Sequence, residues 1–377
     1  MRRWWRARMP GALSISSEDH VLNKIRVVVV DDSALVRSLL AEIINRQPDM
    51  ACVGAASDPL VAREMIRELD PDVITLDVEM PKMDGIEFLG RLMRLRPMPV
   101  VMISTLTERG ADVTMRALEL GAIDFVAKPK LGLADGLAQL ATQIVEKIRI
   151  ASAARVRRKD PVASTLIPAQ ASPAKAASSL KITAAVASRK VVFIGASTGG
   201  TEAIREILTR MPAESPPILI TQHMPAGFTR SFASRLDSLC EITVKEAVNG
   251  EAIQPGHAYI APGGKQFYLS RVGGRLEAVV DDSELVNRHK PSVEVLFRSA
   301  KALLGDNAIG VMLTGMGSDG AKALKDMRDA GSYNIVQDEA TSVVFGMPRE
   351  AISLGAANEV LPITEIAPAL IARLRSF

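Results

Sequence analysis

Short apolar runs alternate with stretches of helical spacing along the first part of the chain. The runs are continuous and rich in β-branched residues, as in strands buried on both faces of a parallel sheet. They lie at 27–30, 51–55, 73–76, 100–103 and 125–127, and the helical stretches lie at 33–46, 59–69, 85–94, 109–120 and 133–149. Five such alternations predict an α/β domain with a five-stranded, doubly wound parallel sheet.

The second half of the chain repeats this pattern with different loops. Strand-like runs lie at 191–194, 218–221, 258–260, 309–313 and 334–337, and helical stretches separate several of them. A second α/β domain with a mainly parallel sheet is therefore predicted.

The composition changes between these halves. Residues 151–188 are dominated by Ala, Ser, Pro, Lys and Arg, and Asp160 is their only acid. Such a segment buries too little apolar surface to offset its ordering entropy, so a flexible, basic linker is expected. We therefore expect one domain at 24–150 and another at 189–377.

The first 23 residues fit neither pattern. Arginines surround Trp4 and Trp5, the only tryptophans, and they interrupt the apolar core that a secretory signal would need. We interpret this segment as a disordered extension, and an arm that binds a membrane surface or a partner is the alternative.

Composition narrows the class of protein further. The chain has 377 residues, 47% hydrophobic and 24% charged, which is ordinary for a globular protein. Its net charge of +3 gives no argument for nucleic-acid binding, and no apolar stretch approaches the ~20 residues of a membrane span. Cys52 and Cys240 are far apart, so we expect no structural disulfide and a reducing, cytoplasmic location.

Polar residues end several predicted strands of the first domain. Asp31 and Asp32 follow the first strand, Asp77 the third, Ser104 the fourth and Lys128 the fifth. Ligands of open parallel sheets bind at this edge, and three converging carboxylates suit Mg²⁺. The set predicts phosphoryl transfer onto Asp77, whereas any one of these acids alone would be read as a helix cap.

In the second domain, a Gly-rich turn at 195–200 joins a strand to a helix and matches G-x-S-x-G at Ser197. The turn would present Ser197 beside unpaired N–H groups at a helix start, which suits a nucleophile. A phosphate-binding loop uses the same geometry and is the alternative.

A serine nucleophile needs a base and an acid. His223 follows the strand at 218–221, and Asp319 lies in another Gly-rich turn after the strand at 309–313, so both are expected at the rim that carries Ser197. His257 precedes a strand and should lie at the opposite edge, whereas His289 lies in a polar loop that could line a cleft. The order Ser, His, Asp argues against an α/β-hydrolase fold.

The acidic motifs of the first domain resemble those of response-regulator receiver domains, which have a flavodoxin-like fold. The matching strings are Val-Asp31-Asp32-Ser, Asp77-Val-Glu-Met-Pro-Lys-Met-Asp-Gly, Ser104-Thr and Lys128-Pro. The resemblance implies that a histidine kinase phosphorylates Asp77 with Mg²⁺ on Asp31, Asp32 and Asp77. It also implies that Ser104, Phe125 and Lys128 form the switch that responds to phosphorylation.

The second domain resembles the catalytic domain of CheB, the chemotaxis protein-glutamate methylesterase family. The matching strings are Gly195-Ala-Ser197-Thr-Gly-Gly, Gln222-His223-Met and Gly315-Met316-Gly-Ser-Asp319-Gly. The resemblance implies Ser197 as nucleophile, His223 as base, Asp319 as orienting acid and the Met316 backbone N–H in the oxyanion hole.

The implied substrates are glutamate methyl esters, with glutamine amides as a second class, on the cytoplasmic helices of methyl-accepting chemoreceptors. The implied control is phosphorylation of the receiver. Two alternatives remain: a response regulator whose second domain only binds a partner, and a hydrolase of this fold acting on another ester. Neither a helix-turn-helix spacing nor a basic recognition stripe is present in the second domain, so no nucleic-acid partner is expected.

Overall fold

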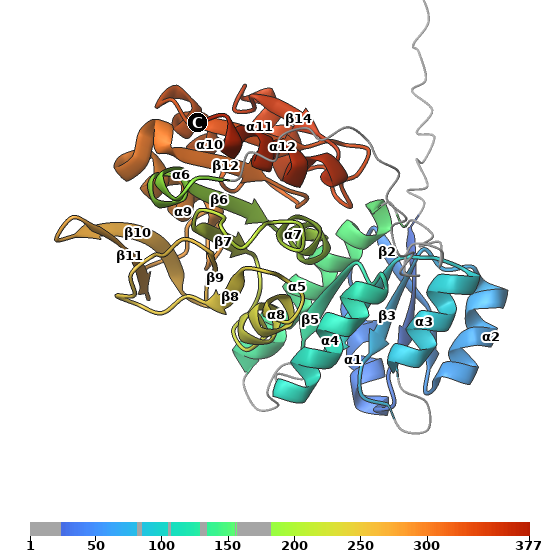
Figure 1. Cartoon of the computed structure of the whole chain (residues 1–377). Helices are drawn as coiled ribbons and strands as arrows, with labels where there is room; N and C mark the ends of the chain where they lie inside the picture. The colour runs from blue at the N-terminus through green and yellow to red at the C-terminus, as the bar shows by residue number, and fades with distance from the viewer. Residues whose placement is uncertain (1–23, 81–84, 105–106, 129–133, 155, 157–181) are drawn as a thin grey trace, which may run out of the picture.

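The computed structural model describes residues 24–80, 85–104, 107–128, 134–154, 156 and 182–377. These residues form two α/β domains that lie side by side (Figure 1). Among the described residues, no helix is long and apolar enough to cross a membrane. The predicted arm and most of the predicted linker lie outside the described residues, and their boundaries stay predictions.

The N-terminal domain is a five-stranded parallel sheet in the order β2-β1-β3-β4-β5. Its strands are β1 (Ile25–Val30), β2 (Met50–Ala56), β3 (Val73–Asp77), β4 (Val100–Ser104) and β5 (Asp124–Ala127). Its helices are α1 (Ala34–Asn45), α2 (Pro59–Leu69), α3 (Gly85–Leu95), α4 (Glu108–Leu120) and α5 (Ala134–Ala153). Every predicted element is present, which confirms the predicted doubly wound sheet.

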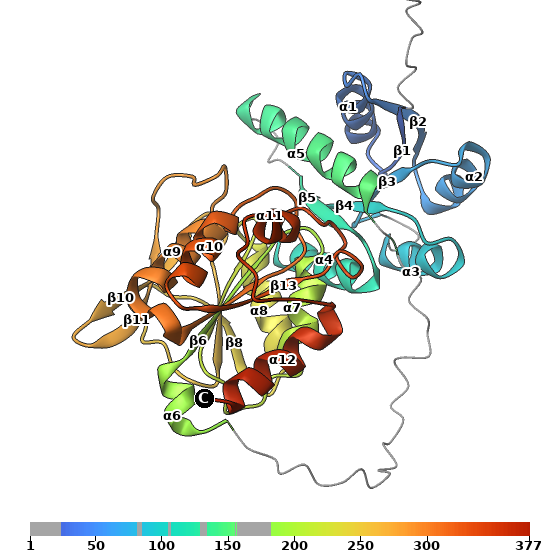
Figure 2. The same ribbon diagram turned by 90° about the horizontal axis from the view of Figure 1, so that it is seen from above.

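Helices cover both faces of this sheet because the strand residues that point to either face are apolar. Leu40 and Ile44 of α1 share one core cluster with Ile144 and Ile148 of α5. Buried residues of α2, α3 and α4 belong to a different cluster on the other face. Figure 2 shows α1 and α5 together on one side of the sheet.

The C-terminal domain has a seven-stranded parallel sheet in the order β14-β13-β12-β6-β7-β9-β8 and a separate antiparallel hairpin, β10-β11. The sheet strands are β6 (Val191–Ala196), β7 (Ile218–Gln222), β8 (Thr243–Glu246), β9 (His257–Ile260), β12 (Ala308–Met312), β13 (Tyr333–Gln337) and β14 (Glu359–Leu361). The hairpin strands are β10 (Gln266–Val272) and β11 (Arg275–Asp281). The mainly parallel sheet was predicted, whereas β8, β14 and the hairpin were not.

The helices of this domain are α6 (Ala184–Arg189), α7 (Gly200–Leu208), α8 (Phe228–Asp237), α9 (Val293–Leu304), α10 (Ala321–Asp329), α11 (Met347–Ser353) and α12 (Ile363–Arg375). All of helix α6 except Arg189 falls within the segment 151–188 predicted as linker. Its Val186 and Ala187 are buried in the core of the C-terminal domain, so this end of the segment packs against the domain.

The two domains meet along α4 and α8. The rings of Phe125 and Phe228 lie 4.4 Å apart between centroids, and one apolar cluster contains residues of both domains. Arg235 of α8 forms an ion pair with Glu119 of α4 at 2.8 Å. The interface therefore joins β5 and α4 of the N-terminal domain to α8 of the C-terminal domain.

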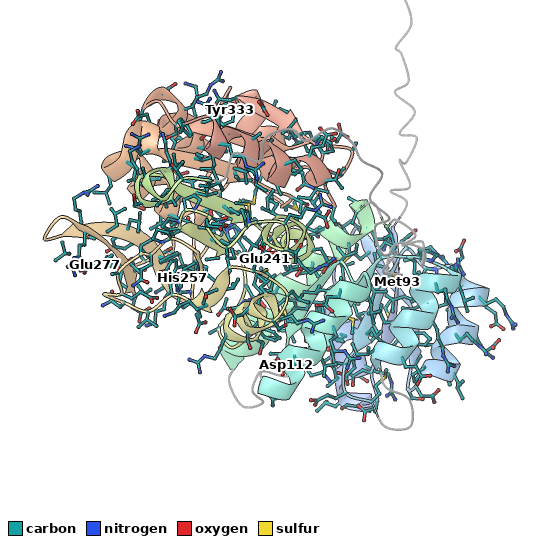
Figure 3. All side chains as sticks on the ribbon, in the orientation of Figure 1. Met93, Asp112, Glu241, His257, Glu277 and Tyr333 are labelled. Carbon is teal, nitrogen blue, oxygen red and sulfur yellow. The ribbon has the colours of Figure 1, made fainter. Side chains whose placement is uncertain are left out.

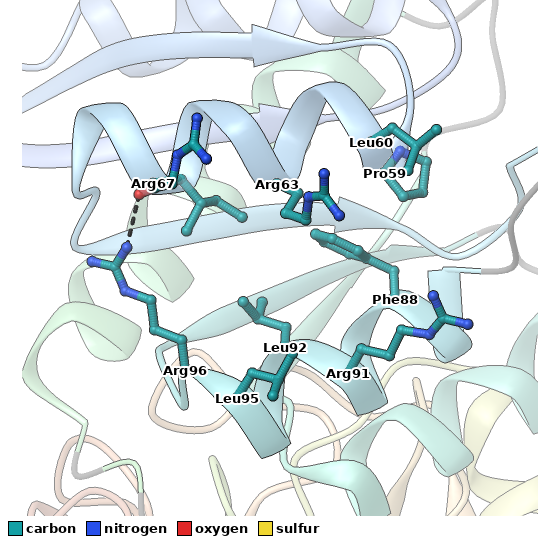
Figure 4. Close-up of a pocket in the computed structure, with 10 residues that line it drawn as sticks. Pro59, Leu60, Arg63, Arg67, Phe88, Arg91, Leu92, Leu95 and Arg96 are labelled. Carbon is teal, nitrogen blue, oxygen red and sulfur yellow. Dashed lines mark hydrogen bonds between the residues drawn. The ribbon is translucent and has the colours of Figure 1, made fainter.

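A groove lies between α2 and α3, on the side of the N-terminal domain away from the C-terminal domain (Figure 4). It encloses about 320 Å³ over Phe88 and Leu92, and four arginines line it. Arg96 closes one end by donating to the carbonyl of Ile66 at 2.8 Å.

Candidate active site

Ser197 lies at the carboxyl end of β6, at the centre of the seven-stranded sheet. Its N–H donates to the carbonyl of Thr314 at 3.0 Å, and its carbonyl accepts from Gly200 N at 2.7 Å as α7 begins. Gly199 allows this turn because its φ is +78° and a Cβ there would lie 2.6 Å from Val343 Cβ. The predicted strand, tight turn and helix around Ser197 are present.

His223 reaches the same rim because of strand register. Ala196 of β6 pairs with Gln222 of β7. Ser197 follows Ala196, and His223 follows Gln222. The backbone N–H of His223 donates to the carbonyl of Ala196 at 3.0 Å. The two residues therefore emerge from adjacent parallel strands at the same level, as the sequence predicts.

Asp319 contacts the imidazole of His223. Its Oδ2 lies 2.9 Å from His223 Nε2, and both side chains are almost wholly buried. The other ring nitrogen, Nδ1, is buried and has no hydrogen-bond partner in the described structure. In the neutral ring, a proton on Nε2 donated to Asp319 leaves Nδ1 as the proton acceptor.

Asp319 is held by a set of donors that the sequence did not indicate. Its carboxylate accepts from Asn287 Nδ2 at 2.8 Å, Ser292 Oγ at 2.8 Å and Val293 N at 2.7 Å. Val293 begins α9, so the acid also caps a helix N-terminus. Burial alone would raise the pKa of Asp319, but hydrogen bonds from His223, Asn287 and Ser292 lower it to about 2.

The turn that carries Met316 packs directly on the serine. A Cβ on Gly315 would lie 2.7 Å from the Cβ of Ser197, so only glycine allows this approach. Gly315 N donates to Val344, and Gly346 N donates back to Gly315, which fixes the turn. The turn thereby holds the Met316 backbone beside Ser197, and the Met316 side chain is 45% exposed.

Two of the other histidines, His257 and His289, lie where the sequence places them, and His20 lies outside the described residues. His257 (Figure 3) is the first residue of β9 and lies at the amino end of the strand. Because β9, β7 and β6 are parallel, this is the edge opposite to the one that carries Ser197. His289 lies in the loop before α9, and its ring stacks on that of His223. The sequence placed His289 in a loop that could line a cleft, and it gave no signal for the stacking.

The predicted acidic pocket is assembled at the carboxyl edge of the N-terminal sheet. Asp31, Asp32 and Asp77 each offer an oxygen, and these atoms lie within 4.8 Å of one another. Lys128 Nζ lies 3.0 Å from Asp31 Oδ2 and 2.8 Å from Asp77 Oδ2. Burial raises the pKa of Asp77 to about 6 against the opposing effect of Lys128, and Asp31 adds to the rise.

Lys128 pairs with two of these three carboxylates, Asp31 and Asp77, so the pocket carries an excess of negative charge. Oxygen ligands at this spacing fit a small divalent cation such as Mg²⁺. The residues present therefore fit the predicted ion.

The remaining predicted residues of this domain border the pocket or the interface. The buried hydroxyl of Ser104 accepts from Thr114 Oγ1 at 2.7 Å and donates to Gly110 O at 3.2 Å. Phe125 is buried against Phe228 of the other domain. Next to it, Asp124 accepts a hydrogen bond from Thr198, the neighbour of Ser197, and forms an ion pair with Lys147 of α5 at 2.6 Å.

The fold and these two sites define a class of protein, a receiver domain joined to a domain with a Ser-His-Asp constellation. The model of the response regulator receiver domain matches residues 27–135, and that of CheB methylesterase matches residues 192–370. The chain belongs to the CheB methylesterase family.

Curated relatives match nearly the whole chain. The protein-glutamate methylesterase/protein-glutamine glutaminase 1 of Albidiferax ferrireducens is 70% identical over 96% of this chain and 97% of its own. The protein-glutamate methylesterase/protein-glutamine glutaminase 2 of Bordetella avium is 60% identical over 93% of this chain and 98% of its own. The crystal structure of the Thermotoga maritima CheB methylesterase catalytic domain is 42% identical, covers 49% of this chain and 99% of its own, and has a TM-score of 0.48.

Proposed function

We propose that the chain is a phosphorylation-controlled serine hydrolase that removes methyl groups from glutamate methyl esters on the cytoplasmic helices of chemoreceptors. The observation that carries the proposal is the bond between His223 and Asp319 beside Ser197, on a chain that is 70% identical to a relative named for this activity. A histidine kinase is the proposed phosphodonor, and the cytoplasm is the proposed location.

The chemistry assigned to Ser197 and His223 is acyl transfer. Ser197 Oγ attacks the ester carbonyl carbon while His223 Nδ1 takes the hydroxyl proton, and Asp319 stabilises the imidazolium that results. Collapse of the tetrahedral intermediate breaks the bond to the methoxy oxygen, which leaves as methanol with the proton from His223. Water, deprotonated by His223, then attacks the acyl carbonyl carbon. The bond to Ser197 Oγ breaks as this oxygen takes the proton from His223, and glutamate is released.

The oxyanion would be stabilised by the Met316 N–H. This donor has no partner among the hydrogen bonds of the described residues, so it is available to a developing negative charge. Preorganised donors of this kind contribute about 3–4 kcal/mol to acyl transfer.

A glutamine side chain offers the same carbonyl with a poorer leaving group. Expulsion of ammonia depends more strongly on proton transfer from His223 than expulsion of methanol does. We therefore propose deamidation as a slower second activity of the same residues, in line with the glutaminase part of the relatives' names.

Control would begin at Asp77. Asp31, Asp32 and Asp77 would hold Mg²⁺, which supplies charge neutralisation for the phosphoryl oxygens. Transfer of the phosphoryl group onto the Asp77 carboxylate adds charge next to Lys128, which now pairs with Asp77 and Asp31. That change would be passed to the interface through β5, where Phe125 and Asp124 contact the catalytic domain.

The test is methanol release from methylated chemoreceptor membranes by the full chain, with and without a small phosphodonor and Mg²⁺. We expect release to rise with the donor and to fall by more than about 10³-fold in Ser197→Ala. Ser318→Ala is the control, because this exposed serine lies in the same Gly-rich turn as Asp319 and has no assigned role. Release that persists in Ser197→Ala would remove Ser197 as the nucleophile, and no release from folded wild type would point to another ester.

A further inference from the structure

The ring of His289 lies flat on the ring of the proposed base. The centroids of His289 and His223 are 3.7 Å apart, and the ring planes differ by 8°. His223 is therefore bounded at its edge by Asp319 and on one face by His289. Stacking at this distance restricts rotation of the His223 ring out of the plane of its bond to Asp319.

The loop that carries His289 is fixed through its backbone. His289 N donates to Val286 O at 2.9 Å, Val286 N donates back at 3.2 Å, and buried Gln266 donates from Nε2 to His289 O at 3.1 Å. Asn287 and Arg288 have φ values of +52° and +68°, which cost energy in a non-glycine residue. The hydrogen bond from Asn287 to Asp319 ties this strained turn to the proposed acid.

His289 remains uncharged at neutral pH. Burial and the neighbouring His223 lower its pKa to about 4, and Lys147 of α5 acts in the same direction while Asp319 opposes them. Within the described part of the chain, the His289 ring nitrogens form no hydrogen bond. The ring thus has neither the protonation state nor the contacts of a second proton carrier.

We propose that His289 is a positioning residue, a neutral aromatic plate that holds His223 in line with Asp319 and keeps water from one face of the imidazolium formed during catalysis. The inference rests on the proposed function, because it assigns a role in the same reaction. A charged ring at this place would repel the imidazolium, whereas a neutral ring presents its π face to it.

Matched substitutions test the plate. His289→Phe keeps a flat ring without a titratable group, and we expect kcat within threefold of wild type. His289→Ala removes the ring, and we expect kcat to fall about tenfold with KM within twofold, which corresponds to the loss of one aromatic contact.

A second measurement does not depend on substrate. The chain has only four histidines, so long-range ¹H–¹⁵N spectra of the imidazole rings can follow His223 and His289 separately. We expect His223 to carry its neutral-state proton on Nε2 and His289 to stay neutral to about pH 4 in the wild type. In His289→Ala, the proton on His223 Nε2 should become divided between the two ring nitrogens, because the ring is no longer held in line with Asp319, and in His289→Phe it should stay on Nε2.

The outcomes separate the two proposals. Failure of wild type to release methanol, with the redistribution of the His223 proton still seen in the His289→Ala spectra, would overturn the function and leave the plate intact. Unchanged kcat and an unchanged His223 tautomer in His289→Ala would overturn the plate. A His289→Phe variant as slow as His289→Ala would also overturn it, because a ring nitrogen would then be required.

Discussion

Asp77 and Asp319 are both buried carboxylates at the carboxyl edge of a parallel sheet, and their surroundings drive their pKa values in opposite directions. Asp77 shares Lys128 with Asp31, and burial raises its pKa to about 6. Asp319 is surrounded by donors from His223, Asn287 and Ser292, which lower its pKa to about 2.

This difference separates a site that awaits a ligand from a site that is already complete. The Asp77 pocket has more negative charge than its own residues can neutralise, so a cation and a phosphoryl group would relieve it. The hydrogen-bonding capacity of Asp319 is already met by this chain, so it can orient His223 without help.

The largest effect is expected from Asp319→Asn. The amide cannot fix the Nε2–H tautomer of His223, and loss of the equivalent charge in serine proteases costs about 10⁴-fold in kcat. We expect a loss of 10³- to 10⁴-fold in methanol release. Asp329→Asn, an exposed acid at the end of α10, is the matched control and should keep wild-type activity. A loss below tenfold in Asp319→Asn would mean that His223 is oriented by other contacts.

The second largest effect is expected on the stimulation of methanol release by phosphorylation, when Asp77 is replaced. Asp77→Asn cannot accept a phosphoryl group, so the phosphodonor and Mg²⁺ should no longer raise methanol release. The unstimulated rate should stay within twofold of wild type, because Asp77 lies outside the catalytic domain. Parallel assays of the two proteins with and without donor measure this. Stimulation that survives in Asp77→Asn would place the phosphorylation at another residue.

Asp77 and Asp319 should also contribute to the folding stability of chelator-treated protein with opposite dependence on pH. The raised pKa of Asp77 means that its contribution to folding is favourable at low pH and is lost as pH rises from about 4 to 6. The lowered pKa of Asp319 means that its contribution is present above about pH 4 and is lost as pH falls toward 2.

Asp77→Asn should therefore gain stability over wild type between pH 4 and 7, by roughly 2–3 kcal/mol. Asp319→Asn should lose about as much relative to wild type, and its deficit should already be present at pH 5. Urea unfolding followed by circular dichroism at each pH measures both. The same sign for the two variants would contradict the contrast.

How much of the fold and of the candidate active site could be predicted from the sequence depends on the kind of interaction. Buried parallel strands are marked by continuous apolar runs, so every strand of the N-terminal sheet and the strands that carry Ser197 and His223 were found. The three catalytic candidates follow from strand order and rim position alone. The short edge strands β8 and β14 leave too weak a pattern in three or four residues.

Contacts between distant loops could not be predicted in this way. The hairpin β10-β11 is an exception. It turns at Gly273 and Gly274, both with positive φ, and such a pair of glycines is a sequence signal for a two-residue hairpin turn. Asn287 and Ser292 gave no such signal, because their bonds to Asp319 depend on where the loop before α9 meets the loop before α10. The same holds for Asp124, which contacts Thr198 only because the domains are packed together.

The smallest effect tests whether that packing restrains the catalytic domain. Arg235 and Glu119 form a two-point ion pair across the interface, with Nε–Oε1 and Nη2–Oε2 distances of 2.8 and 3.1 Å, and both side chains are partly exposed. Such pairs contribute at most about 1 kcal/mol. Glu119→Arg should therefore raise unstimulated methanol release by about threefold.

The charge-swapped double variant, Glu119→Arg with Arg235→Glu, should return release to the wild-type level, because the pair is restored with its charges exchanged. Arg46→Glu, which breaks the exposed pair with Glu42 on α1 far from the interface, is the control and should have no effect. Since an exposed pair is screened by salt, the wild-type rate should rise with ionic strength and the Glu119→Arg rate should change less. Equal rates in wild type, single and double variants would mean that the apolar contact of Phe125 with Phe228 holds the domains without help from the ion pair.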